Sequence, residues 1–139
     1  MLTEKQLLNW TRIHRNSIPK KATKVKVNFT DCDYDDEGGV YVQAVARSQE
    51  TGIPHECEIH YYNRNKVWVT CTCEYFKYHC EVANHRRGSS DILESNGKLP
   101  RITNRRMVSH VCKHLYACFI RGASKLKPEK FGNKKPEEE

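Results

Sequence analysis

The sequence predicts an α+β domain, with an antiparallel β meander of about four strands followed by two helices. A short N-terminal helix precedes this unit and a C-terminal tail follows it. Two observations predict the class: apolar and polar residues alternate in short segments between positions 23 and 70, and after Cys73 the period changes to that of a helix. Short links between consecutive strands favour antiparallel pairing over a parallel crossover fold.

Composition limits the size of the core. The chain has 139 residues, of which 37% are hydrophobic and 29% are charged. This is enough for one domain with modest extensions, and the small core is expected to need a staple. Seven cysteines, an odd number, argue against a fully paired disulfide framework, although disulfides between adjacent strands stay an alternative. Without a secretory signal or a run of ~20 apolar residues, we expect a soluble protein of a reducing compartment with no membrane partner.

Residues 1–22 are expected to form an N-terminal helix and a basic linker. The stretch Thr3-Glu4-Lys5-Gln6 matches a capping box, in which the Thr3 hydroxyl accepts from the amide of Gln6 and the Gln6 side chain reaches back. Apolar-leaning residues then recur at helical spacing, which predicts a helix over residues 4–15. Pro19 is interpreted as part of the segment that ends this helix.

Residues 23–122 are expected to form the main domain, which begins with the strands. Alternating patterns predict these strands over residues 23–29, 40–48, 55–62 and 66–70. The acidic run that ends in Gly38-Gly39 predicts a turn between the first two strands. Asn63-Arg64-Asn65 predicts a short hairpin between the last two.

The two helices of the domain are separated by a long polar segment. Phe76, Cys80 and Ala83 recur at helical spacing and predict a helix over residues 74–87. Residues 91–109 form a long polar loop, and loops of this length are often functional. The last helix is expected over residues 109–121, with Gly122 as its C-cap. Residues 123–139 are expected to be a charged tail with no core of its own.

Two short motifs carry the prediction of a metal site. Cys71 and Cys73 end the last predicted strand, while Cys112 and His114 begin the last predicted helix. Residues two apart at a strand end project to the same side, so both sulfurs can reach one ion. Three thiolates and an imidazole complete the tetrahedral donor set of Zn²⁺. We therefore expect one structural Zn²⁺, worth about 10–16 kcal/mol in small modules, with the helix N-terminus favouring the thiolate of Cys112.

The other cysteines and histidines have simpler interpretations. Cys80 faces the apolar stripe of its predicted helix and Cys118 lies one turn after His114, so both are expected in the core. His79 and His110 are the alternatives if one of the four proposed ligands is wrong. Three isolated histidines are expected at the surface: His55, His60 and His85.

Basic residues form two patches that could contact phosphate. The formal net charge is +7, and no acidic residue lies between Thr11 and Thr30. The candidate nucleic-acid-binding residues are Arg12, Arg15, Lys20, Lys21, Arg101, Arg105 and Arg106. An ordinary solvated basic face is the alternative interpretation.

The two metal motifs resemble the SWIM zinc module, which has Cys-x-Cys, a variable gap, and Cys-x-His running into an apolar helix. Here these are Cys71-Thr72-Cys73 and Cys112-Lys113-His114-Leu115, and the resemblance covers residues 67–120. It implies a ββα-like zinc unit that binds DNA or protein and has no catalytic residues. The gap is longer than in the usual pattern, and this long form is similar to short SWIM-like proteins of tailed bacteriophages, which are regarded as virion or structural components.

These observations favour a non-enzymatic structural protein that docks on other protein subunits of a larger assembly. The resemblance implies a virion component assembled in the host cytoplasm. A Cys₃His set closes the zinc shell to water, so we expect neither enzymatic activity nor a small-molecule substrate. The alternative is a cytoplasmic nucleic-acid-binding module that uses the basic patches.

Overall fold

The structure is a computed structural model that describes residues 1–62, 66–93, 95, 97, 100 and 103–136. It confirms the α+β class, but the sheet has five strands rather than about four. The strands are β1 (Leu2–Thr3), β2 (Val25–Tyr34), β3 (Val40–Ser48), β4 (Pro54–Tyr61) and β5 (Lys66–Cys71). The helices are α1 (Glu4–His14), α2 (Ile18–Ala22), α3 (Glu81–Arg86) and α4 (Lys113–Ile120), with a π-helical turn η2 (Phe76–Cys80) and two 3₁₀ turns, η3 (Ala123–Lys125) and η4 (Pro128–Phe131).

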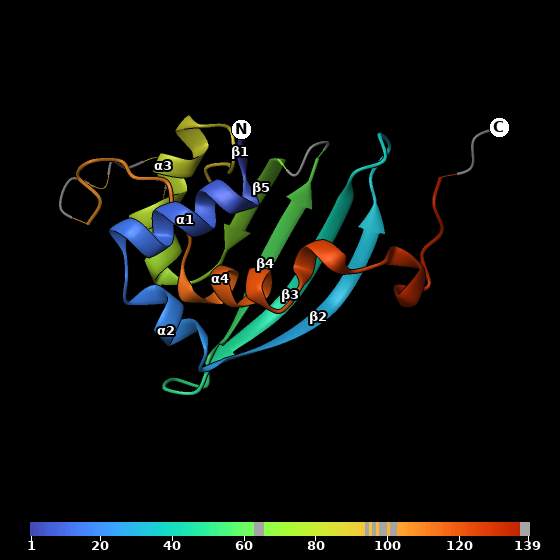
Figure 1. The fold of residues 1–139 in the computed structure, drawn as a ribbon, viewed down its shortest axis with the longest axis horizontal. Helices are drawn as coiled ribbons and strands as arrows, with labels where there is room; N and C mark the ends of the chain where they lie inside the picture. The colour runs from blue at the N-terminus through green and yellow to red at the C-terminus, as the bar shows by residue number, and fades with distance from the viewer. Residues whose placement is uncertain (63–65, 94, 96, 98–99, 101–102, 137–139) are drawn as a thin grey trace.

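The strands lie in the order β1-β5-β4-β3-β2, and every neighbouring pair is antiparallel. Figure 1 shows α1 and α4 lying over one face of this sheet. Strand residues on that face alternate with outward residues and are buried, as in Val42, Ala44 and Ala46 of β3. They pack in one cluster with helical residues such as Leu7, Phe76 and Leu115. The core therefore lies between the sheet and the layer of helices.

The N-terminal helix forms for the reason that the sequence indicates. The Gln6 amide donates to Thr3 Oγ1 at 3.1 Å, and the Thr3 amide donates to Gln6 Oε1 at 2.9 Å, so both halves of the capping box are present. Before the cap, Leu2 and Thr3 pair with β5 and add a fifth strand to the sheet. Two residues are too few to show an alternating pattern, so β1 is not predictable from local sequence.

The segment after α1 is helical where the sequence predicts a linker. Pro19 lies in the first turn of α2, where proline is tolerated because its missing N–H has no helical partner. The sequence interpretation treats the same proline as an end signal. Burial of Ile18 and Ala22 explains why this short helix is retained.

The first long strand extends beyond its predicted end. A register shift between Phe29 and Asp31 marks a bulge, after which β2 continues to Tyr34 through residues predicted to lie in a turn. Cys32 is thereby buried on the core side. The C-terminal segment packs along this strand, because the Asn133 side-chain amide donates to the Cys32 carbonyl at 2.7 Å. Residues 123–133, predicted as a tail, contain η3 and η4, and both Ala123 and Pro128 are buried.

The first of the two predicted helices is present nearly as expected, since residues 74–86 are helical without a break and contain the π-helical turn η2 followed by α3. The last helix is shorter than predicted, because it begins at Lys113 rather than near Ser109. The loop itself is held by Glu81, a buried residue whose carboxylate accepts from the amides of Leu93 at 3.2 Å and Ser95 at 2.9 Å. The predicted hairpin at residues 63–65 lies outside the described residues. No helix in the described part of the chain is long and apolar enough to cross a bilayer.

One buried hydroxyl connects α1 to the segment that leads into α4. Thr11 Oγ1 donates to the Leu7 carbonyl at 2.7 Å and accepts from the Val111 amide at 3.1 Å. We predict that Thr11→Val lowers the free energy of unfolding by about 1–3 kcal/mol, because the buried Val111 N–H loses its acceptor. Urea unfolding measures the loss, and hydrogen exchange at the Val111 amide should accelerate. Thr11→Ser keeps the hydroxyl, so equally fast exchange in both variants would contradict the assignment.

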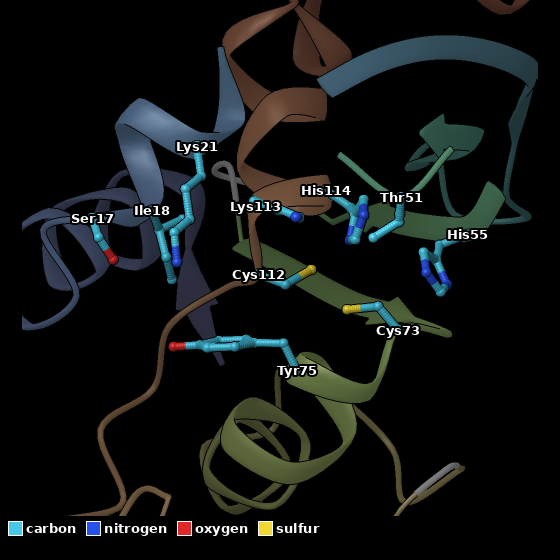
Figure 2. A pocket seen from close by; sticks show the side chains of 10 residues that line it. All are labelled: Ser17, Ile18, Lys21, Thr51, His55, Cys73, Tyr75, Cys112, Lys113 and His114. Atoms are coloured by element: carbon cyan, nitrogen blue, oxygen red, sulfur yellow. The ribbon is translucent and has the colours of Figure 1, made fainter. Parts of the chain in front are cut away.

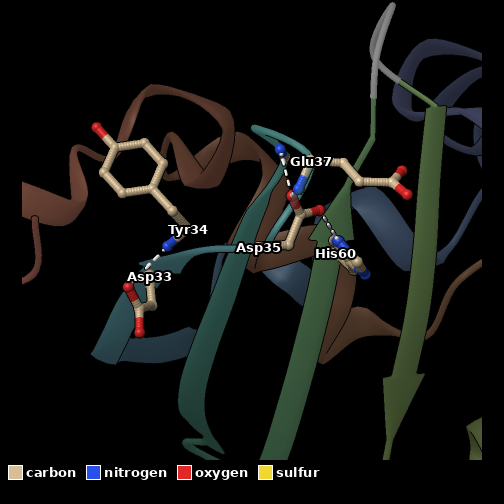
Figure 3. A network of polar contacts seen from close by, with 6 residues as sticks. Asp33, Tyr34, Asp35, Glu37 and His60 are labelled. Atoms are coloured by element: carbon tan, nitrogen blue, oxygen red, sulfur yellow. Dashed lines mark hydrogen bonds and ion pairs between the residues drawn. The ribbon is translucent and has the colours of Figure 1, made fainter. Parts of the chain in front are cut away.

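A polar network lies where β2 turns into β3 (Figure 3). Asp35 Oδ2 lies 2.6 Å from His60 Nε2, and Asp35 Oδ1 accepts from the amides of Glu37 at 2.8 Å and Gly39 at 2.6 Å. A Cβ at Gly39 would lie 2.2 Å from Asp35 Oδ2, so this approach requires glycine. His60, predicted at the surface, is instead buried, because Asp35 pairs with it and two aromatic rings cover it.

This network predicts a pH dependence of stability. Burial acts to raise the pKa of Asp35, but the hydrogen bonds from His60 and from the two amides outweigh it and lower the pKa below its ordinary value of 3.8. A lowered folded-state pKa stabilises the protein above the unfolded-state pKa, and the effect is lost as pH falls through the folded value. Asp35→Asn should therefore destabilise the protein at neutral pH and progressively less below about pH 4. Urea unfolding of both proteins across this pH range measures the difference in their free energies of unfolding. A difference that does not change with pH would contradict the prediction.

Candidate metal centre

Four side chains with metal-binding donors converge between the sheet and α4. The donor atoms of Cys71, Cys73, Cys112 and His114 all lie within 4.8 Å of one another, and all four residues are buried. These are the four residues that the sequence predicts as ligands. Their spacing is short enough for one metal ion to contact all of them.

The local backbone structure positions the two pairs of candidate ligands, Cys71 with Cys73 and Cys112 with His114. Cys71 is the last residue of β5, and Cys73 precedes the first helical turn after it. The Phe76 amide donates to Cys73 Sγ at 3.3 Å, just as the Leu115 amide donates to Cys112 Sγ at 3.5 Å. Cys73 and Cys112 therefore each cap a helical turn, because each sulfur accepts a hydrogen bond from the backbone N–H of the residue three positions later. These amide–sulfur bonds fix the sulfurs and favour their charged form.

His114 provides the clearest sign of a missing partner. It is buried in the first turn of α4, and within the described part of the chain neither ring nitrogen has a hydrogen-bond partner outside the cluster. A neutral imidazole has one donor and one acceptor, and each buried unsatisfied group costs about 1–3 kcal/mol. Coordination of a metal ion through one nitrogen would remove one of these penalties. The residues present therefore fit a metal ion.

The thiols of the cluster differ in acidity. Hydrogen bonds from Cys112 and then Cys71 lower the pKa of Cys73 far below its ordinary value of 9.0. Burial, together with the neighbouring cysteines, raises the pKa of Cys112 well above that value. The thiolate is therefore favoured at Cys73, while burial and the neighbouring cysteines oppose the thiolate at Cys112. A cation would stabilise the thiolate form of all three, so metal binding should release protons.

The remaining thiols and histidines lie around the cluster without joining it. Cys57 faces Cys71 across β4 and β5, and its thiol donates to Cys71 Sγ at 3.7 Å. This contact follows from the strand register and not from any spacing in the sequence. Cys80 and Cys118 are buried in the core, as predicted. All seven cysteines are free thiols.

The two alternative ligands have other contacts. His79 stacks on the Tyr75 ring, with centroids 4.0 Å apart and planes 3° from parallel. His110 Nε2 lies 3.0 Å from the Tyr75 hydroxyl, and His110 Nδ1 lies 2.8 Å from the Val108 carbonyl oxygen. Both histidines therefore belong to a polar network around Tyr75 rather than to the metal cluster.

A pocket of about 220 Å³ opens beside the cluster (Figure 2). Cys73, Cys112 and His114 line it together with the basic side chains of Lys21 and Lys113. His55 lies on the same wall, its ring centroid 4.8 Å from that of His114. An ion could reach these three donors through the pocket, and the lysines would offset part of the negative charge of the thiolates.

The predicted nucleic-acid-binding residues do not form one surface set. Arg15 is half-buried and lies 3.4 Å from Asn104 Oδ1, which holds the long loop against α1. Arg12 contacts the side chain of its helical neighbour Asn9. The exposed cations among the candidates are Lys20, Lys21, Arg105 and Arg106, together with Arg12. Arg101 lies outside the described residues.

No protein-family model, curated protein or solved structure matches this chain. The metal centre is therefore defined by its donor atoms and their surroundings alone.

The cluster predicts that a metal ion supports the fold. Cys112→Ser should lose the bound metal and lower the free energy of unfolding by at least several kcal/mol, because a buried ligand is removed. Cys80→Ala is the matched control, since Cys80 is equally buried but lies outside the group of four donors. Elemental analysis and urea unfolding of both variants provide the measurement. Metal retained by Cys112→Ser, or lost by Cys80→Ala, would be inconsistent with this site.

Proposed function

We propose that this chain is a non-enzymatic interaction protein whose fold is stapled by one structural zinc ion. The observation that carries the proposal is the buried set of three cysteines and His114, whose ring nitrogens lack other partners. Soft thiolate and imidazole ligands in a tetrahedral set favour zinc over oxygen-seeking cations such as Mg²⁺. Four protein ligands complete that shell, which supports a structural role rather than a catalytic one.

Zinc in this position would join the two layers of the domain. Cys71 ends β5, which pairs with β1 and β4, whereas Cys112 and His114 lie at the start of α4, which contacts β2 to β5. An ion shared by both would hold α4 at a defined position on the sheet. Such a crosslink would make the surface of the domain rigid, and a rigid surface is suited to docking on other proteins.

We further propose that this chain is one subunit of a larger assembly. The resemblance of the two motifs to the long-gap SWIM-like proteins of tailed bacteriophages supports a virion component assembled in the host cytoplasm. In that setting the partners are other protein subunits. Mass spectrometry of purified particles should find the chain at a fixed ratio to the major subunits, and its absence from particles would exclude the virion role.

Nucleic-acid binding is the second candidate, supported by the exposed cations Lys20, Lys21, Arg105 and Arg106. The internal contact of Arg15 leaves this candidate with fewer free charges than the sequence indicates.

Salt dependence separates the two functions. We predict that the full chain binds duplex DNA weakly, with no steep loss of affinity as salt rises. A true DNA-binding surface would show a log–log slope of about −0.9 for each neutralised phosphate. Fluorescence anisotropy of a labelled duplex measures this slope, with Lys20→Gln and Arg105→Gln as test variants and Lys130→Gln, an exposed cation on η4, as control. A steep slope reduced only in the test variants would favour the second candidate.

A further inference from the structure

The sheet face turned away from α1 and α4 carries a stack of three rings. The Tyr41 and His60 centroids lie 3.8 Å apart, and those of His60 and Tyr62 lie 3.9 Å apart. His60 is 5% exposed, whereas Tyr41 is 45% exposed and Tyr62 is 36% exposed. The two tyrosines therefore offer ring surface to a ligand, with His60 held between them by its bond to Asp35.

Carboxylates surround this stack, although the chain as a whole is basic. Asp33 lies opposite Tyr41 in the β2–β3 register. Burial first, and then the nearby charges, raises the pKa of the Tyr62 hydroxyl. The carboxylates that contribute to this shift are Asp35, Asp91 and Glu37. The edges of the stack are therefore acidic.

The same face is hollowed next to the rings. A depression of about 150 Å³ is lined by Glu56 and Glu58 of β4 and by Gln43 of β3. Neither glutamate has an ion-pair partner in the described part of the chain. Glu56, Glu58 and His60 alternate along β4, so their outward side chains follow one another at about 7 Å.

We propose that this face binds an extended peptide segment of another protein that carries arginine or lysine at alternate positions. One cation would lie over the exposed ring of Tyr41 or Tyr62, and the next two would meet Glu58 and Glu56. Aromatic ring faces attract cations, and side chains on one side of an extended segment repeat at about the same 7 Å. Phosphate groups would be repelled by the carboxylates, so nucleic acid fits this face poorly. This binding site goes beyond the proposed function and does not depend on the identity of the metal.

Binding of a short basic peptide to the full chain tests the inference. The probe is a labelled peptide with three arginines alternating with serine, and its partner peptide has glutamate in place of arginine. We expect fluorescence anisotropy to detect only the arginine peptide. The double variant Glu56→Gln/Glu58→Gln should weaken its binding about tenfold, and Tyr41→Ala/Tyr62→Ala should weaken it by about five- to tenfold.

Matched controls separate this site from general charge attraction. Tyr41→Phe/Tyr62→Phe keeps the rings and should retain binding. Lys26→Gln/Arg47→Gln alters a cross-strand pair farther along β2 and β3 and should also have little effect. Equal binding of the glutamate peptide, or arginine-peptide binding that survives the Glu56→Gln/Glu58→Gln change, would overturn the proposal. So would single-stranded DNA that binds through the same residues, or self-association that the tyrosine variants abolish.

Discussion

Four donor atoms converge between the end of β5 and the start of α4, at the junction of the sheet and the helical layer. Cys71 and Cys73 belong to the sheet layer, whereas Cys112 and His114 belong to the helical layer, and a long polar loop separates the two pairs in sequence. Because α4 packs on β2 to β5, its position determines how the sheet is covered. A shared metal ion would fix that position directly, and the Thr11 bond to the Val111 amide fixes the chain just before it.

Local signals in the sequence predict those parts of the fold that local interactions determine. The capping box of α1 and the alternating pattern of β3 appear in the structure as expected, because each is determined by neighbouring residues. Pairing of Leu2 and Thr3 with β5, and continuation of β2 through its bulge, are determined by distant partners. The role of Pro19 is ambiguous in the sequence, because proline can follow the end of one helix or lie in the first turn of the next. Burial of Ile18 and Ala22 in the folded chain favours the second role.

The candidate site also combines features that local sequence predicts with features that depend on distant residues. Ligand identity follows from the spacing of two Cys/His pairs, and the structure brings those four donors together. Their surroundings do not follow from spacing. The contact of Cys57 with Cys71 depends on strand register, and the low pKa of Cys73 depends on hydrogen bonds from Cys112 and Cys71, which only the folded chain brings close. The internal role of Arg15 likewise depends on where the long loop lies, since charge alone predicts a surface contact.

The two faces of the sheet thus have different properties. One face is covered by helices and contains the cysteine cluster, while the other exposes tyrosines and glutamates. We propose that zinc holds the covered side together, and X-ray absorption at the zinc edge tests this most directly. We expect three sulfur ligands at about 2.3 Å and one nitrogen at about 2.0 Å in the purified protein. A first shell of oxygen ligands, or a protein that folds with no zinc bound, would contradict it.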